Sequence, residues 1–150
     1  MGHTYTSLLS HVIFSTKDRL PYLREDRGND VFAYMGGIVR KLNASAIGIN
    51  GIEDHVHMLV RLPPSLSTAK TVEIVKTNSS RWIHERRVLH RTFGWQSGYA
   101  AFSVSESKMD EVSKYIRAQQ EHHRKATFQE ELIAFLERAH IQYDDRYLWR

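Results

Sequence analysis

Two short apolar segments near the middle of the chain restrict the fold more than any other feature. Residues 44–52 and 55–62 are separated only by Glu53-Asp54, and Pro63-Pro64 follows the second segment. Two extended segments joined by so short a polar connection are typical of an antiparallel β-hairpin. Segments with the apolar spacing of helices precede and follow this hairpin, so the fold must place helices around two adjacent strands.

The flanking segments continue this alternation of strands and helices. Residues 5–16 are rich in β-branched and aromatic residues, and residues 93–105 combine aromatic residues with glycine, so both predict strands. Residues 25–42 and residues 67–87 have apolar side chains at the i, i+3, i+4 spacing of amphipathic helices. The order β-α-β-β-α-β matches a ferredoxin-like sandwich of the α+β class, in which the first and third strands are central.

Two additional helices are expected at the C-terminal end. Apolar spacing predicts a helix over residues 109–124, and the capping box Thr127-Phe128-Gln129-Glu130 predicts the start of another helix. A chain of 150 residues is of the usual size for one domain, so we expect residues 1–150 to form a single domain.

Composition excludes several classes of site. The chain has no cysteine, which excludes disulfide frameworks, thiolate zinc sites and cysteine nucleophiles, and favours a cytoplasmic location. No apolar run approaches the roughly 20 residues that cross a bilayer, so we expect no membrane partner. The net charge of +4 and the pI near 9.4 are compatible with a polyanionic partner such as nucleic acid.

Part of the positive charge is concentrated in a cluster of arginines. Arg81, Arg86, Arg87 and Arg91 lie within one short stretch that also contains Trp82. Such a cluster is compatible with contacts to a DNA backbone, but a solvated helix face explains it equally well. We therefore treat these arginines as candidate DNA-binding residues only.

The sequence His55-Val56-His57 is the main chemical feature. Side chains at i and i+2 of a strand point to the same face, so both imidazoles converge while Val56 faces the opposite side. A histidine pair is more often structural than a metal site. With an amide oxygen, however, two imidazoles would suit Mg²⁺ or Mn²⁺, whereas Zn²⁺ prefers a closed tetrahedral set that the chain does not obviously provide.

A second group of polar residues lies in the predicted helix 109–124. Tyr115 and Gln119 are spaced i, i+4, which places them on one face, and His122 continues this face. Taken alone, a tyrosine at such a position usually belongs to the core. Together with a metal held by the histidines, it would supply what phosphodiester transfer needs, namely a polarised phosphate and an aligned nucleophile.

Three segments and the C-terminal tail carry a resemblance to a known family. Residues 54–60, 93–105 and 115–123 and the ending 141–149 resemble the IS200-like transposases of the IS200/IS605 family, including the REP-associated tyrosine transposases. These enzymes are single-strand transposases of the HUH type. The likeness covers nearly the whole chain, with the segments in the same order.

The resemblance implies roles for individual residues. It implies that His55, His57 and Gln119 bind the metal, Mg²⁺ or Mn²⁺, and that Tyr115 forms a 5′-phosphotyrosine with single-stranded or hairpin DNA. On helical spacing rather than on the resemblance, His122 and His123 are also close enough to enter or support the metal site. The resemblance also implies a homodimer in which the tyrosine helix of one subunit can complete the site of its partner.

Two other functions remain open from the sequence. A βαββαβ fold is also found in non-catalytic modules that bind single-stranded nucleic acid through aromatic residues on the sheet. A metal nuclease that activates water, with Tyr115 only structural, would use the same histidines. A covalent protein–DNA adduct distinguishes the transposase from both alternatives.

Overall fold

A computed structural model describes residues 2–122 and 126–150, apart from the side chains of Glu121 and His122. The helices and strands are, in chain order, β1 (Leu9–Ser15), η1 (Lys17–Arg19), α1 (Glu25–Lys41), β2 (Ser45–Ile52), β3 (His55–Arg61), α2 (Thr68–Arg86), β4 (Ala100–Val104), η2 (Glu106–Lys108), α3 (Met109–Arg117), α4 (Gln119–His122) and α5 (Phe128–Arg138). Within these described residues, no helix is long and apolar enough to cross a membrane.

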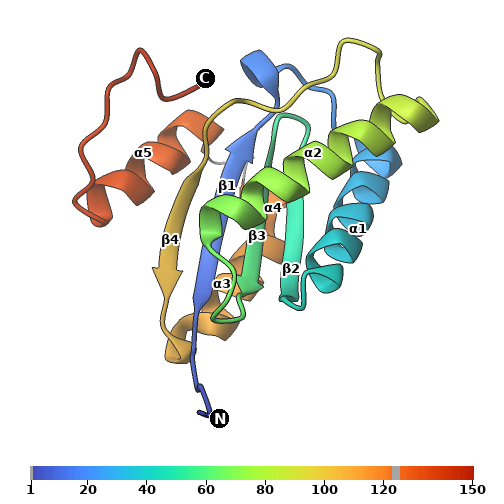
Figure 1. The fold of residues 1–150 in the computed structure, drawn as a ribbon. Coiled ribbons are helices and arrows are strands. Elements are labelled where there is room, and N and C mark those ends of the chain that lie inside the picture. Colours follow the sequence, from blue (N-terminus) through green and yellow to red (C-terminus); the bar gives the residue numbers. More distant parts are fainter. Residues whose placement is uncertain (1, 123–125) are drawn as a thin grey trace.

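The strands form one antiparallel sheet in the order β2-β3-β1-β4 (Figure 1). The two central strands are therefore β1 and β3, the first and third along the chain, as the ferredoxin-like pattern predicts. Helices α1 and α2 pack on one face of the sheet, and α3, α4 and α5 lie on the other face (Figure 1). The α+β fold with additional C-terminal helices is thus confirmed.

Alternation along β3 divides the interior into two parts. Val56, Met58 and Val60 are fully buried in the larger core, between the sheet and helices α1 and α2. On the opposite face, Leu59 packs with Ile116 of α3, and Ile13 of β1 packs with apolar residues of α5. The C-terminal helices therefore bury a face that would otherwise be open.

Helix ends follow the expected signals where a side chain caps the backbone. The Ser67 hydroxyl accepts a hydrogen bond from the Lys70 amide at the start of α2, and the Thr127 hydroxyl accepts one from the Glu130 amide at the start of α5. Such caps satisfy amide groups that have no partner within the helix. The predicted start of α5 is therefore confirmed.

The first and last predicted strands were too long. Strand β1 begins at Leu9, where pairing with Arg61 and Val104 starts, while Tyr5 is 89% exposed. Most of segment 93–99 lies outside the ladder. The segment contacts the end of β1 through an isolated bridge between Trp95 and Thr16, and Oε1 of Gln96 accepts a hydrogen bond from the Ser15 amide at 2.7 Å.

The prediction of one continuous helix over residues 109–124 was also wrong. Helix α3 ends at Arg117, and Ala118 leaves helical geometry with φ −94° and ψ 19°. The short helix α4 then begins at Gln119. Helical spacing therefore does not determine which way Gln119 and the residues after it point relative to Tyr115.

The turn that precedes the histidine strand depends on a close backbone approach at Gly51. A Cβ atom at this position would lie 2.1 Å from the carbonyl oxygen of His55, whereas a Cβ atom at Gly37 of α1 would meet no atom within 4 Å. We expect Gly51→Ala to lower the free energy of unfolding by about 2 kcal/mol, because the two strands must separate. Gly37→Ala should raise it by up to about 1 kcal/mol. Urea unfolding measures both, and equal effects would contradict this account of the turn.

Candidate metal and nucleophile site

His55 and His57 lie on the central strand β3, where hydrogen bonding on both sides fixes the backbone. Their partners in β1 are Ser15 and Ile13, and both histidine side chains are fully buried. The two rings have centroids 5.1 Å apart. The structure therefore brings the predicted histidine pair together on the face covered by α3, α4 and α5.

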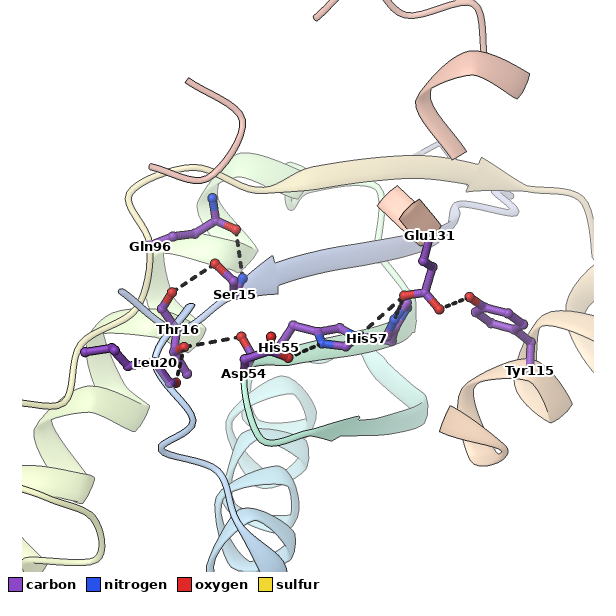
Figure 2. Close-up of polar contacts among 9 residues, drawn as sticks. All are labelled: Ser15, Thr16, Leu20, Asp54, His55, His57, Gln96, Tyr115 and Glu131. Atoms are coloured by element: carbon purple, nitrogen blue, oxygen red, sulfur yellow. Dashed lines mark hydrogen bonds and ion pairs between the residues drawn. The ribbon is translucent and has the colours of Figure 1, made fainter. Parts of the chain in front are cut away.

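The turn before β3 holds His55 in a defined orientation. The Nδ1 atom of His55 lies 2.8 Å from Oδ1 of Asp54 (Figure 2). The carbonyl oxygen of Asp54 accepts a hydrogen bond from the Thr16 amide at 2.9 Å, which ties this turn to the end of β1. The ring of Phe128 stacks on His55 with centroids 4.1 Å apart. Backbone, carboxylate and aromatic contacts together leave this imidazole one orientation.

The electrostatic surroundings of His55 favour its protonated form. Burial lowers the pKa of His55, but hydrogen bonds and charges from Asp54 and Glu131 outweigh burial, so its pKa is raised overall. Two carboxylates beside one buried imidazole compensate positive charge. This environment would also favour a cation at the same place.

Glu131 of α5 is the residue that joins the histidines to the tyrosine. Its Oε1 atom lies 2.9 Å from Nε2 of His57 and 3.5 Å from Nε2 of His55. Its Oε2 atom accepts a hydrogen bond from the Tyr115 hydroxyl (Figure 2). The side chain is 2% exposed, so these partners offset the cost of burying a carboxylate.

Sequence reasoning missed Glu131, although a signal for it was present. The buried stripe of α5 consists of Phe128, Leu132 and Leu136. Glu131 lies on the same stripe, at i+3 from Phe128 and one residue before Leu132. An acidic residue at an inward position of an amphipathic helix indicates a buried partner. Only the fold identifies the histidines as that partner.

Tyr115 reaches the site from α3. Its ring centroid lies 5.7 Å from that of His57, within the same chain. Burial raises the pKa of Tyr115 above its usual range, and the contact with Glu131 raises it further, whereas a hydrogen bond with Gln119 and the charge of Arg138 act in the opposite direction. The phenol is therefore held in its protonated form, with a carboxylate at its hydroxyl.

Gln119, the third predicted ligand, lies beside Tyr115. Gln119 is fully buried, and its Nε2 atom lies 3.4 Å from the carbonyl oxygen of Tyr115. It belongs to the same cluster as Tyr115, on the far side of the break at Ala118. The His122 side chain and all of His123 lie outside the described residues.

His11 of β1 is a second buried residue that sequence reasoning missed. It is 2% exposed, and its Nε2 atom lies 2.8 Å from Nδ1 of His57. Burial lowers the pKa of His11 to about 3, and the neighbouring His57 contributes to this shift, while Glu131 opposes it. A lone histidine in a strand gives no sequence signal, because its partner is 46 residues away.

The donor atoms at this site are suited to a divalent cation. His55, His57 and Glu131 each offer one ligand atom, and these atoms lie within 4.8 Å of one another. Two imidazole nitrogens and one carboxylate oxygen form a common ligand set for divalent metals of intermediate softness. The residues present therefore fit a metal ion, and Glu131 joins Gln119 as a candidate for the third protein ligand.

A cleft gives access to the buried cluster. It has a volume of about 890 Å³, and its lining includes Tyr115, Glu131 and His11. Phe102 and Phe135 contribute aromatic surface to this lining, and its charged side chains are the cations Lys108 and Arg138 and the carboxylates Glu111, Glu130 and Glu131. The tyrosine hydroxyl thus lies beside a space large enough for part of a nucleic-acid strand.

The arginine cluster lies elsewhere in the fold. Arg81 and Arg86 belong to α2, which covers the opposite face of the sheet, and Arg87 and Arg91 follow this helix. All four side chains are exposed. The structure does not bring them to the histidine face.

Acid titration should reveal the buried histidine. Burial lowers the pKa of His11 from its ordinary value of 6.5 to about 3, so the unfolded chain binds more protons between these pH values. The free energy of unfolding should therefore fall as pH decreases through this window, with a contribution from His11 of at most about 1.4 kcal/mol per pH unit. In chelator, His11→Gln should reduce this slope relative to wild type, and His3→Gln, an exposed control, should not. Equal slopes in all three proteins would argue against a neutral buried His11.

Comparisons with known proteins find relatives of this chain in sequence and in structure. Residues 4–119 match the family model described as "Transposase IS200 like". The transposases for insertion sequence element IS200 of Salmonella typhimurium and Salmonella typhi are each 27% identical over 131 residues, covering 81% of this chain and 82% of theirs.

Two solved structures share the fold. A protein from Deinococcus radiodurans R1, assigned as a transposase, superimposes with a TM-score of 0.61 at 21% identity, covering 79% of this chain and 96% of that one. A REP-associated tyrosine transposase bound to a REP hairpin gives a TM-score of 0.60 at 12% identity, covering 82% of this chain and 73% of that one. With a family match that spans most of its length, the chain belongs to the IS200-like transposases.

Proposed function

We propose that the chain is a metal-dependent transposase that cleaves and rejoins single-stranded DNA through a 5′-phosphotyrosine on Tyr115. The observation that carries this proposal is the position of Glu131, which contacts the nucleophile on one side and His57 on the other. A phenol, two imidazoles and a carboxylate thus meet at one buried point beside a cleft. Membership of a transposase family favours this activity over a module that only binds nucleic acid.

His55, His57 and Glu131 would hold a divalent cation, Mg²⁺ or Mn²⁺, which when bound would supply positive charge to a non-bridging oxygen of the scissile phosphate. Two nitrogen ligands favour Mn²⁺ over Mg²⁺, because Mg²⁺ prefers oxygen ligands and retains water. Gln119, beside Tyr115, remains our second candidate for the third protein ligand.

Tyr115 would perform the transfer itself. Its hydroxyl proton passes to Glu131, the phenolic oxygen bonds to phosphorus, and the bond from phosphorus to the 3′ oxygen breaks. The 3′ oxygen takes up a proton from water and leaves as a hydroxyl, while Glu131 keeps the phenolic proton for the return step. Because the phosphotyrosine retains a phosphodiester linkage, a later 3′ hydroxyl can attack it and restore the phenol without ATP.

The proposed substrate is single-stranded DNA next to a hairpin. A structural relative is described as bound to a REP hairpin. The cleft at Tyr115 offers aromatic rings that suit unpaired bases, and Lys108 and Arg138 among its charged side chains suit phosphates. The exposed arginines Arg81, Arg86, Arg87 and Arg91 are proposed contacts for the hairpin backbone, on a surface separate from the cleavage site.

We retain a homodimer as part of the proposal, in a modified form. Tyr115 lies beside His57 of the same chain, so one chain suffices to bring phenol and imidazole together. A second subunit would therefore serve to join two DNA ends, and an exchange of tyrosine helices is an alternative arrangement rather than a requirement.

A covalent adduct tests the activity. The probe is a pool of oligonucleotides with a fixed hairpin and randomised single-stranded flanks, incubated with Mn²⁺ and separated on a denaturing gel. A 3′ label should shift with the protein, whereas a 5′ label should remain on a shorter free fragment that ends in a 3′ hydroxyl. Tyr115→Phe should form no adduct, and Tyr5→Phe, a control for an exposed tyrosine, should match wild type. Cleavage by Tyr115→Phe would identify a water-activating nuclease instead.

Matched variants test which residue is the third ligand. We expect Glu131→Gln and His57→Ala to weaken Mn²⁺ binding at least 10-fold by calorimetry, because each removes one of three protein ligands. Both variants should still bind the hairpin, since the exposed basic surface is unchanged. Glu130→Gln, an exposed neighbour in the same helix, is the control. A larger loss in Gln119→Ala than in Glu131→Gln would restore Gln119 as the third ligand.

A further inference from the structure

His11 has no part in the chemistry proposed above, yet it makes one of the shortest contacts of the site. Its Nε2 atom lies 2.8 Å from Nδ1 of His57, and both rings are buried. The rings are nearly parallel, with an interplanar angle of 29°. One nitrogen of this pair must carry hydrogen and the other must accept it, so the contact defines the protonation pattern of a proposed metal ligand.

The hydrogen positions follow from the partners of His57. Oε2 of Glu131 accepts a hydrogen bond from the Tyr115 hydroxyl, and Oε1 lies 2.9 Å from Nε2 of His57. With a carboxylate as acceptor, Nε2 of His57 must carry the hydrogen. In neutral His57, Nδ1 is then an acceptor, and Nε2 of His11 must be the donor.

A cation reverses this pattern. Nε2 of His57 can bind a metal only after losing its hydrogen, and a neutral imidazole then carries its hydrogen on Nδ1. With a cation bound, the Nε2 hydrogen of His11 would pass to Nδ1 of His57, so that Nε2 of His11 becomes the acceptor. Nε2 of His57 would release its hydrogen to water, and Nδ1 of His11 would take one up from water in the cleft that it lines. Both rings therefore change tautomer together, with no change in total charge on the pair.

The partner of His55 differs in this respect. Nδ1 of His55 faces the carboxylate of Asp54 at 2.8 Å, which only accepts when ionised. His55 therefore already has hydrogen on Nδ1, as ligation through Nε2 requires. Only His57 needs a partner that can donate in one state and accept in the other, and a histidine is such a partner.

We propose that His11 is a positioning residue that exchanges donor and acceptor roles with His57 and thereby makes His57 available as a metal ligand. This inference deepens the proposed function and rests on its metal site. His11 does not touch the metal or the phosphate in this scheme. It acts through His57, by supporting the ring in both tautomers.

Nuclear magnetic resonance of protein labelled with ¹⁵N-histidine measures the tautomers directly. In chelator, both His11 and His57 should carry hydrogen on Nε2. With Zn²⁺, a diamagnetic probe that accepts histidine ligands, both should carry hydrogen on Nδ1. A His11 ring that keeps hydrogen on Nε2 while His57 binds Zn²⁺ would overturn the proposal.

Substitutions at His11 supply an independent readout. His11→Leu offers neither donor nor acceptor and should weaken Mn²⁺ binding about 10- to 100-fold. His11→Gln offers both through its amide and should stay within about 3-fold of wild type, an effect that a purely structural role would not produce. Leu9→Val, on the same strand and the same face, controls for lost packing, and circular dichroism in chelator confirms that each variant is folded.

Different results would contradict the metal site and the role of His11. If wild type bound neither Mn²⁺ nor Zn²⁺, the metal site itself would be wrong. If wild type bound both cations and His11→Leu bound Mn²⁺ as tightly, only the role of His11 would be wrong. Equal loss of affinity in His11→Leu and His11→Gln would likewise assign His11 to packing.

Discussion

A buried carboxylate is the interaction on which the candidate site depends. Removing an ionised side chain from water costs several kcal/mol, and only hydrogen-bonding or charged partners can offset that cost. Glu131 finds its partners on two other elements, the imidazoles of β3 and the phenol of α3. Glu131 and the apolar residues of α5 together dock this helix on the sheet, and the docking places the Phe128 ring against His55.

Sequence patterns over a few neighbouring residues were sufficient to predict the order of helices and strands and the shared direction of His55 and His57. The hairpin is specified by its two-residue connection, and the direction of His55 and His57 follows from the period of two along a strand. The same period placed Val56 in the opposite core, as found. These features depend only on residues close together in the chain, so they could be predicted without knowledge of the fold.

Contacts between distant segments could not be predicted in this way. Glu131 is 74 residues from His57, and His11 is 46 residues from it. The break at Ala118 and the late start of the last strand also involve tertiary contacts: Asn50 donates to the last carbonyls of α3, and Gln96 pairs with the end of β1. An acidic residue among the buried apolar residues of a helix, such as Glu131, indicates that a buried partner exists, but the sequence does not show which residue that partner is.

The division of β3 into two faces has a consequence for sequence divergence. Val56, Met58 and Val60 pack with the α1 and α2 layer, while the imidazoles contact residues of β1, α3 and α5. Substitutions in the core beneath α1 and α2 therefore change none of the side chains that contact the two imidazoles. Such substitutions can accumulate without displacing the nitrogen atoms of His55 and His57. Strand β3 thus separates a core under α1 and α2 that tolerates substitution from a histidine face under α3, α4 and α5 that does not.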